Sequence, residues 1–176
     1  YLRLINSVTC FVISSDSLLL KNNIEINCVT NFLKYLNNEQ DLISAASVIS
    51  YLTKENKKTS LLLTQLQSSK NLFTILNELG IKLNQNTFSQ KNIFDCCVEI
   101  ISALNLNKNN DQYIRFFLDE INEYLVNKTG SINDFLIWWD KRKDQASLII
   151  PEGTNAVKVM TIHKSKGLEF PVVILP

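Results

Sequence analysis

The sequence predicts a mostly helical protein with a small β part, in which a long helical region lies between strands of an incomplete parallel sheet. Strand-like, β-branched runs occur near the two ends, as SVTCFVIS at residues 7–14, VKVMTI at 157–162 and VVIL at 172–175. Between them, apolar residues recur with the period of a helix. Proline is found only from position 151 onward, and glycine only at 80, 130, 153 and 167, so the middle contains few helix breakers. Because these strands are too few to form a domain, we expect further strands from residues outside this sequence.

The first predicted elements are a strand over residues 7–14 and two amphipathic helices. Ser14, Ser15 or Asp16 could cap a helix directly after the strand. The next helix starts at residue 24, and its predicted apolar face consists of Ile24, Cys28, Val29, Phe32, Leu33 and Leu36. The second covers residues 41–52, and its predicted inward residues are Leu42, Ala45, Ala46, Ile49 and Leu52.

Four more helices follow, with a loop in the middle. We predict helices over residues 61–66 and 72–79, the second ended by Gly80. Residues 84–92 are predicted to be a loop with Ser89 as a helix cap. The apolar positions of the next helix are Ile93, Phe94, Cys97, Val98, Ile101 and Leu104. The longest apolar stripe, closed by Gly130, consists of Tyr113, Ile114, Phe117, Leu118, Ile121, Tyr124 and Leu125.

The last predicted helix is rich in aromatic residues. Ser131 and Asp134 resemble a capping box with Asp in place of Glu, and the helix carries Phe135, Trp138 and Trp139. Aromatic side chains could stack on nucleic-acid bases, but at helical spacing they more often form a core, and we favour the core. Adjacent helical residues point about 100° apart, so one of the two tryptophans should lie nearer the surface.

Composition and charge limit the kinds of site that the chain could carry. With a net charge of +1 over 176 residues, the chain has no overall attraction to nucleic acid, so any binding must be local. The lysine-rich run at residues 53–60 could contact a DNA backbone, but a solvated loop is the favoured interpretation. The four cysteines lack CxxC spacing, and there is one histidine, so we predict no metal ligands and interpret the cysteines as reduced thiols of a cytoplasmic protein. No apolar run reaches the ~18 residues that a membrane span requires.

The residues with the clearest chemistry lie between the last two predicted strands. Thr161, His163 and Ser165 can donate hydrogen bonds to phosphate oxygens, and the Lys164 and Lys166 amines add positive charge. Gly167 would let the backbone approach a ligand, and the Glu169 carboxylate can accept a hydrogen bond from a sugar hydroxyl. A solvated turn without a ligand would account for the same composition.

The order of these residues is more specific than their composition. The pattern T-x-H-x-S-K-G-L-E-F, preceded by V-x-V-M and followed by P-V-V, resembles motif V of the UvrD/Rep-type superfamily 1 DNA helicases. The ending P-V-V-I-L-P looks most like the RecB/AddA helicase–nuclease subunits. The resemblance implies that Thr161 and His163 contact the backbone of single-stranded DNA, and we place Ser165 with them. It also implies that Gly167 and Glu169 approach a nucleotide; we assign Lys166 to the nucleotide too, although its ammonium could serve the DNA or an ion pair.

The resemblance also implies a domain layout and a function. Residues 1–23 would be the early part of the second RecA-like motor domain, residues 24–146 a helical insertion subdomain, and residues 147–176 the return to the motor domain with motif V. The expected function is that of an ATP-dependent DNA helicase moving along single-stranded DNA in recombination and double-strand-break repair. Its partners would be single-stranded and duplex DNA, and a further candidate is a second helicase–nuclease subunit. The full-length enzyme would use ATP and Mg²⁺.

We expect the chain to be an inactive piece of a longer enzyme. Tyr1 is not a natural start, and the chain stops at Pro176 directly after a predicted strand. A helicase of this type needs a GxxxxGK[ST] loop for ATP, and the sequence contains none. We therefore assign no catalytic residue and expect no cofactor to be held by this chain alone. The alternative is a helical module that binds a protein or duplex DNA and has no motor activity of its own.

Overall fold

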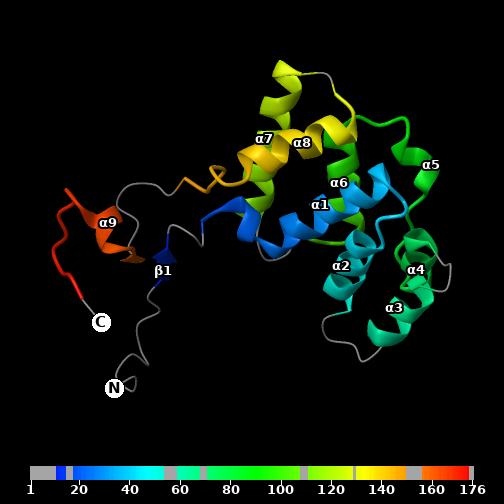
Figure 1. Cartoon of the computed structure of the whole chain (residues 1–176), viewed down its shortest axis with the longest axis horizontal. Helices are drawn as coiled ribbons and strands as arrows, with labels where there is room; N and C mark the ends of the chain where they lie inside the picture. Colours follow the sequence, from blue (N-terminus) through cyan, green and yellow to red (C-terminus); the bar gives the residue numbers. More distant parts are fainter. Residues whose placement is uncertain are drawn as a thin grey trace. The chain divides into compact units, whose positions relative to one another are not determined.

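The computed structural model describes residues 11–14, 18–53, 59–67, 71–107, 111–128, 130–149 and 156–174. In chain order its elements are β1 (Phe11–Ser14), η1 (Leu20–Asn22), α1 (Ile24–Asn37), α2 (Leu42–Leu52), α3 (Thr59–Gln67), α4 (Leu72–Glu78), α5 (Gln85–Phe88), α6 (Ile93–Ala103), α7 (Asp111–Asn127), α8 (Ile132–Arg142), β2 (Ala156–Val159) and α9 (Ile162–Ser165) (Figure 1). The predicted mostly helical fold with a small β part is confirmed. The chain divides into two compact units, one of residues 19–148 and one that combines 1–18 with 149–176.

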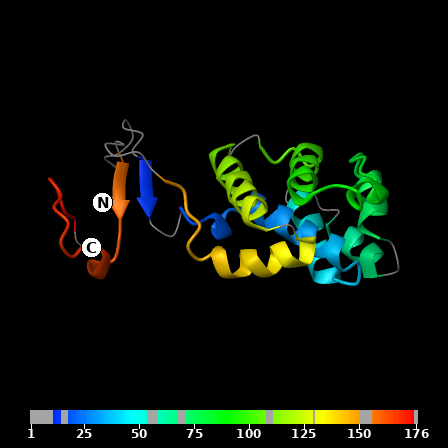
Figure 2. The same ribbon diagram turned by 90° about the horizontal axis from the view of Figure 1, so that it is seen from above.

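The helical unit, residues 19–148, is organised around α1. This helix contacts α2, α6, α7 and α8 (Figures 1 and 2). Its apolar face is buried, and four of its side chains are fully inaccessible to water: Ile26, Val29, Phe32 and Leu33. Aromatic side chains form two groups in this unit. One joins α1, α4 and α5 through Phe32, Tyr35, Phe73 and Phe88. The other joins α7 and α8 through Phe117, Tyr124, Phe135, Trp138 and Trp139.

The ends of the helices are fixed by local side-chain and backbone hydrogen bonds. Side-chain oxygens accept from a backbone N–H at the starts of α1, α2, α4, α5, α6 and α8, where the capping residues are Asn23, Asp41, Asn71, Asn84, Asn92 and Ser131. The predicted capping box of Ser131 and Asp134 is confirmed. At the end of α4, Gly80 has a φ of 82°, and the Gly80 and Ile81 N–H groups donate to the carbonyls of Asn77 and Leu76. This is a Schellman motif, and it confirms that Gly80 ends α4.

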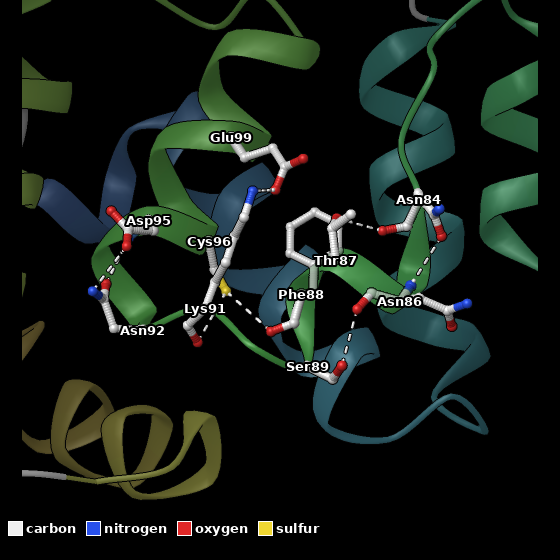
Figure 3. Close-up of polar contacts among 10 residues, drawn as sticks. All are labelled: Asn84, Asn86, Thr87, Phe88, Ser89, Lys91, Asn92, Asp95, Cys96 and Glu99. Carbon is white, nitrogen blue, oxygen red and sulfur yellow. Dashed lines mark hydrogen bonds and ion pairs between the residues drawn. The ribbon is translucent and has the colours of Figure 1, made fainter.

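The connection between α4 and α6 corrects one prediction. Residues 85–88 form the short helix α5, which buries Phe88, so residues 84–92 are not all loop. Ser89 does not cap α6; its hydroxyl donates to the Asn86 carbonyl at 2.9 Å (Figure 3). The cap is Asn92, whose side-chain oxygen accepts from the Asp95 N–H at 2.8 Å. Asn92 is the cap because it directly precedes the first residue of α6, whereas Ser89 directly follows the last residue of α5.

Predictions for three other positions in the helical unit are also corrected. Ile24, Leu42 and Val98 were expected to point inward but are 43%, 45% and 41% exposed. Ile24 and Leu42 are the first residues of α1 and α2, where each helix has only begun to contact its neighbours. Gly130 follows α7 as predicted, but it does not adopt the left-handed backbone of a glycine cap. Its role is steric, because a Cβ atom there would lie 2.2 Å from the Tyr124 hydroxyl oxygen.

Three cysteines are buried and form no disulfide among the described residues, as expected for core cysteines: Cys28, Cys96 and Cys97. Cys10 lies outside the described residues. The Cys96 thiol faces the carbonyls of Phe88 and Lys91 at 3.8 and 3.9 Å (Figure 3). Burial raises the pKa of Cys96 to about 11, and burial also raises the pKa of Cys97. Both therefore stay protonated and unreactive near neutral pH. None of the described helices combines the length and apolarity needed to cross a membrane.

The β part is a pair of parallel strands, β1 and β2 (Figure 2). In their register, Phe11 is opposite Ala156 and Ser14 is opposite Val159. Parallel strands require a crossover connection, and here the connection includes the whole helical unit. The described part of the first predicted strand, residues 11–14, is therefore confirmed; residues 7–10, with Ser15 and Asp16, lie outside the described residues, as do 54–58 of the lysine-rich run. Ser14 ends β1 and caps no helix.

The two C-terminal strand predictions need correction. The strand expected over residues 157–162 ends at Val159, and Ile162 already belongs to α9. Residues 172–174 of the strand expected over 172–175 are not in a strand, and Leu175 lies outside the described residues. A strand is stabilised by hydrogen bonds to a neighbouring strand, and no described strand pairs with residues 172–174.

Candidate functional site

The predicted site begins where β2 ends. Thr161 is the N-cap of α9, and its hydroxyl oxygen accepts from the Lys164 N–H at 3.4 Å. The Ser165 hydroxyl donates to the carbonyl of Ile162 at 2.9 Å, which ties it to its own helix. A hydroxyl both accepts and donates, so the capping role of Thr161 leaves its hydrogen able to donate to a ligand. Donation by Ser165 to a ligand would require its hydroxyl to turn away from Ile162.

A tight turn follows α9. The Leu168 N–H donates to the Ser165 carbonyl at 3.0 Å, Lys166 has φ −60° and ψ 121°, and Gly167 has φ 82°. These values define a type II β-turn, whose third residue needs a positive φ and is usually glycine. The turn therefore explains Gly167 without a ligand. A Cβ atom at Gly167 would meet nothing within 4 Å, so the backbone there is also open to approach.

The side chains of the predicted site lie on the surface of the described structure. Thr161, His163, Lys166 and Glu169 are exposed, and Ser165 is half-buried. The α9 turn and the β-turn bring them into one short stretch of chain. No hydrogen bond or ion pair engages the side chains of His163, Lys166 or Glu169 within the described part of the chain. They are therefore accessible to a ligand.

The chemistry of this segment suits the polar parts of a nucleotide better than a metal ion. An ammonium and an exposed backbone turn are compatible with phosphate oxygens, and a carboxylate with a ribose hydroxyl. Across the described ranges, no three His, Cys, Asp or Glu side chains gather as metal ligands. We therefore assign no Mg²⁺ ligand to these residues.

Comparison with protein families indicates the class of protein that this chain resembles. Residues 108–176 match the family model described as the UvrD-like helicase C-terminal domain. The match includes α7, α8, β2 and α9, so it contains residues of both compact units. This part of the chain is therefore similar to the C-terminal domain of the UvrD-like helicases.

The similar curated proteins identify the type of helicase more narrowly. The chain is 40% identical over 67 residues to the AddA component of the ATP-dependent helicase/nuclease of Syntrophomonas wolfei, an alignment that covers 35% of this chain and 5% of that protein. The proteins of the same name from Acetivibrio thermocellus and Clostridium botulinum are 31% identical over 81 residues and 36% identical over 78 residues. These alignments cover 43% and 42% of this chain, and 6% of each relative. The predicted resemblance to the AddA-like members of the UvrD/Rep type is confirmed. No solved structure matches the chain significantly.

Proposed function

We propose that this chain is part of an ATP-dependent DNA helicase that moves along single-stranded DNA. We assign it to an AddA-like helicase–nuclease that acts in recombination and double-strand-break repair in the cytoplasm. The observation that carries the proposal is the exposed segment 161–169, which lies inside the part of the chain that matches the UvrD-like domain. The names of the similar proteins, all components of a helicase/nuclease, support the same class.

In this proposal, the two ends of the segment serve different ligands. Thr161 and His163, with Ser165, donate hydrogen bonds to phosphates of the DNA strand. Imidazole needs only to donate, so His163 is not required to act as a general base. Lys166 and the open backbone at Gly167 approach the nucleotide, and Glu169 accepts from its ribose. Hydrolysis of ATP supplies the free energy for movement, and a stretch that contacts both ligands couples the two events.

The division of the chain into two compact units, 19–148 and 1–18 with 149–176, supports the proposed domains. We assign the strands β1 and β2 to a RecA-like motor domain, formed by residues 1–23 and 147–176, and the helices between them to an insertion subdomain at 24–146. The proposed partners of the insertion are duplex DNA and a second helicase–nuclease subunit. The alternative, a helical interaction module without motor activity, is favoured by one observation: residues 19–148 form a compact unit with a core of their own.

The proposal is tested in the full-length protein with His163→Ala and Glu169→Ala. A hydrogen bond to a charged group contributes about 1.5–3 kcal/mol, so each loss should cost about tenfold or more in the affected parameter. We expect His163→Ala to weaken binding of a single-stranded oligonucleotide, and Glu169→Ala to lower kcat/KM for ATP. Lys158→Ala is the matched control, because Lys158 is an exposed cation on β2, outside the motif. Unchanged DNA affinity and ATP turnover in both variants would refute the assignment of this segment.

A further inference from the structure

The helical unit contains an open pocket that the predicted site does not include. It has a volume of about 520 Å³ and lies between the end of α7 and one face of α8. We call it the α7–α8 pocket; its principal lining residues are Tyr124, Lys128, Gly130, Ile137, Trp138 and Lys141. On α8, residue 141 is four positions after 137 and three after 138, and residue 128, directly after the end of α7, is four positions after 124, so Lys141 and Lys128 each lie near the preceding residues that line the pocket.

The two lysines give this pocket two cationic groups against one carboxylate, that of Asp134. Lys128 and Lys141 are exposed, and neither forms an ion pair within the described structure. The next two basic residues of α8 differ, since Arg142 is paired with Glu120 at 2.8 Å and Lys143 with Asp140 at 2.6 Å. Asp134, which also lines the pocket, accepts hydrogen bonds from the backbone N–H and hydroxyl of Ser131 at 3.0 and 2.8 Å. These hydrogen bonds and, to a smaller extent, the charge of Lys128 lower the pKa of Asp134, so one carboxylate faces the two ammonium groups. The pocket therefore favours an anionic ligand.

The floor of the pocket is aromatic and apolar. Trp138 is half-buried, and its ring packs against those of Tyr124 and Phe135, with centroids 5.2 and 5.8 Å apart. Its neighbour Trp139 is only 4% exposed, whereas Ile137 beside it is 52% exposed. One part of the Trp138 ring is thus packed in the core, and another part lines the pocket. A flat group of a ligand could stack on the part that lines the pocket.

A polar group at the edge of the pocket lacks a partner. Tyr124 is 2% exposed, and its hydroxyl is buried with no hydrogen bond to any described residue. Buried hydroxyls in native proteins are nearly always hydrogen-bonded, so an unpartnered one needs an explanation. It lies against Gly130, where a Cβ atom would come within 2.2 Å of it. Because glycine has no Cβ atom, it leaves room for this hydroxyl at the wall of the pocket.

We propose that the α7–α8 pocket binds one nucleotide unit of a single-stranded nucleic acid. The base stacks on Trp138 and contacts Ile137, and the phosphate lies between the ammonium groups of Lys128 and Lys141. The Tyr124 hydroxyl donates to the nucleotide or to a water that it holds. A nucleotide joins a flat apolar group to an anion, which is the combination that the pocket offers. An acidic peptide would supply the anionic group, but its carboxylate side chains would not supply a flat apolar group that could stack on Trp138.

Tryptophan fluorescence of the 176-residue chain tests this site directly. The chain has two tryptophans, and only Trp138 lines the pocket. We expect oligothymidylate to quench the fluorescence of the Trp139→Phe variant, in which Trp138 is the only indole. It should not quench that of Trp138→Phe, in which only the buried indole remains. No quenching of Trp139→Phe at low salt would overturn the proposal.

The lysines are tested by their effect on affinity and on its salt dependence. We expect Lys128→Gln and Lys141→Gln each to weaken oligothymidylate binding about tenfold at low salt. Each should reduce the slope of log affinity against log salt by about 0.7, the value for one phosphate contact on a single strand. Lys143→Gln is the matched control, because Lys143 is paired with Asp140 and does not line the pocket. Equal effects of all three substitutions would overturn the proposal.

Two further measurements separate this site from its rivals. Polyglutamate that quenches Trp138 as strongly as oligothymidylate would overturn the nucleotide assignment in favour of an acidic protein partner. Lys158→Ala should leave the Trp138 quenching unchanged, because Lys158 lies on β2 and does not line the pocket. The pocket and the proposed motif therefore fail independently: loss of quenching rejects the former, and unchanged His163 and Glu169 variants reject the latter.

Discussion

The helical unit and the β2–α9 segment differ in where their apolar side chains lie. All the buried apolar residues of the described structure fall between Leu20 and Leu148. In the C-terminal segment the described valine, isoleucine and leucine side chains are exposed, from 47% at Val157 to 83% at Ile174, and Met160 and Phe170 are half-buried. The sequence of the segment is nevertheless that of a buried strand, rich in valine and isoleucine. The helical unit therefore supplies its own core, whereas the segment has the composition of a buried sheet without a described cover.

This difference separates two sources of stability. Burial stabilises roughly in proportion to the apolar area removed from water, at about 25 cal/mol per Å². Helices α1, α7 and α8 gain this contribution from one another, because their apolar faces meet within the unit. Exposed residues such as Val172 and Ile174 do not gain it within the described structure. Substitutions should therefore affect the two regions very differently.

The largest expected effect is that of a core truncation in the helical unit. Phe117 is fully buried and packs edge-on against Trp139, with ring centroids 5.0 Å apart. We expect Phe117→Ala to lower the free energy of unfolding by about 3–5 kcal/mol, which is typical for a buried Phe. The matched substitution Ile174→Ala should change it by less than about 0.5 kcal/mol. Urea unfolding followed by circular dichroism measures both, and similar values would show that the two regions do not differ as described.

A smaller effect is expected where Gly130 faces the Tyr124 hydroxyl. The added methyl group of Gly130→Ala would overlap the hydroxyl oxygen and should cost about 1–3 kcal/mol, as overpacking usually does. Tyr124→Phe removes that oxygen, which has no partner to lose, so alone it should be nearly neutral. In the double variant we expect most of the Gly130→Ala cost to disappear. A double-mutant cycle by urea unfolding measures this coupling, and additive effects would contradict the steric explanation.

The smallest effect concerns acid sensitivity of the helical unit. Hydrogen bonds from Ser44 lower the pKa of Asp41, and hydrogen bonds from Ser131 lower the pKa of Asp134. Because the folded-state pKa lies below the unfolded value of about 3.9, both carboxylates stabilise the fold above that pH. This contribution is lost as the pH falls through the folded-state pKa. We expect the unfolding midpoint of Asp134→Asn to depend less on pH below about 4 than that of the unchanged chain. An unchanged pH dependence would contradict the role of the cap.

Local rules predicted most of the helical unit, and their failures have identifiable causes. The apolar period predicted α1 and α2, and the capping box of Ser131 and Asp134 predicted the start of α8. Ser89 was predicted as a cap because the short helix α5, which ends just before Ser89, was not anticipated, and the observed cap is Asn92. One of the two tryptophans was correctly expected nearer the surface. The spacing of 124 with 128, and of 137 with 141, was the available signal for the α7–α8 pocket, but only the packing of α7 against α8 brings these residues together.

In the C-terminal segment, by contrast, the order of residues was more informative about the family than about the local structure. The order of residues from Thr161 to Phe170 was enough to identify the family, and the match over residues 108–176 bears this out. The same residues did not reveal the single helical turn of α9, because a strand ending at Val159 and one ending at Ile162 have the same composition. Nor did they reveal that Gly167 serves a type II turn, which only the backbone angles show.

The sequence by itself determined the longer helices, the capping box of α8 and the resemblance to the helicase family, because these depend on neighbours within a few positions along the chain. Only the tertiary structure decided that β1 pairs in parallel with β2, and that Tyr124, Trp138 and the two lysines line one pocket. These features join residues that are distant in the chain or on different helices. Their arrangement depends on which surfaces remove apolar area from water, and a periodic pattern does not specify the partner of each surface.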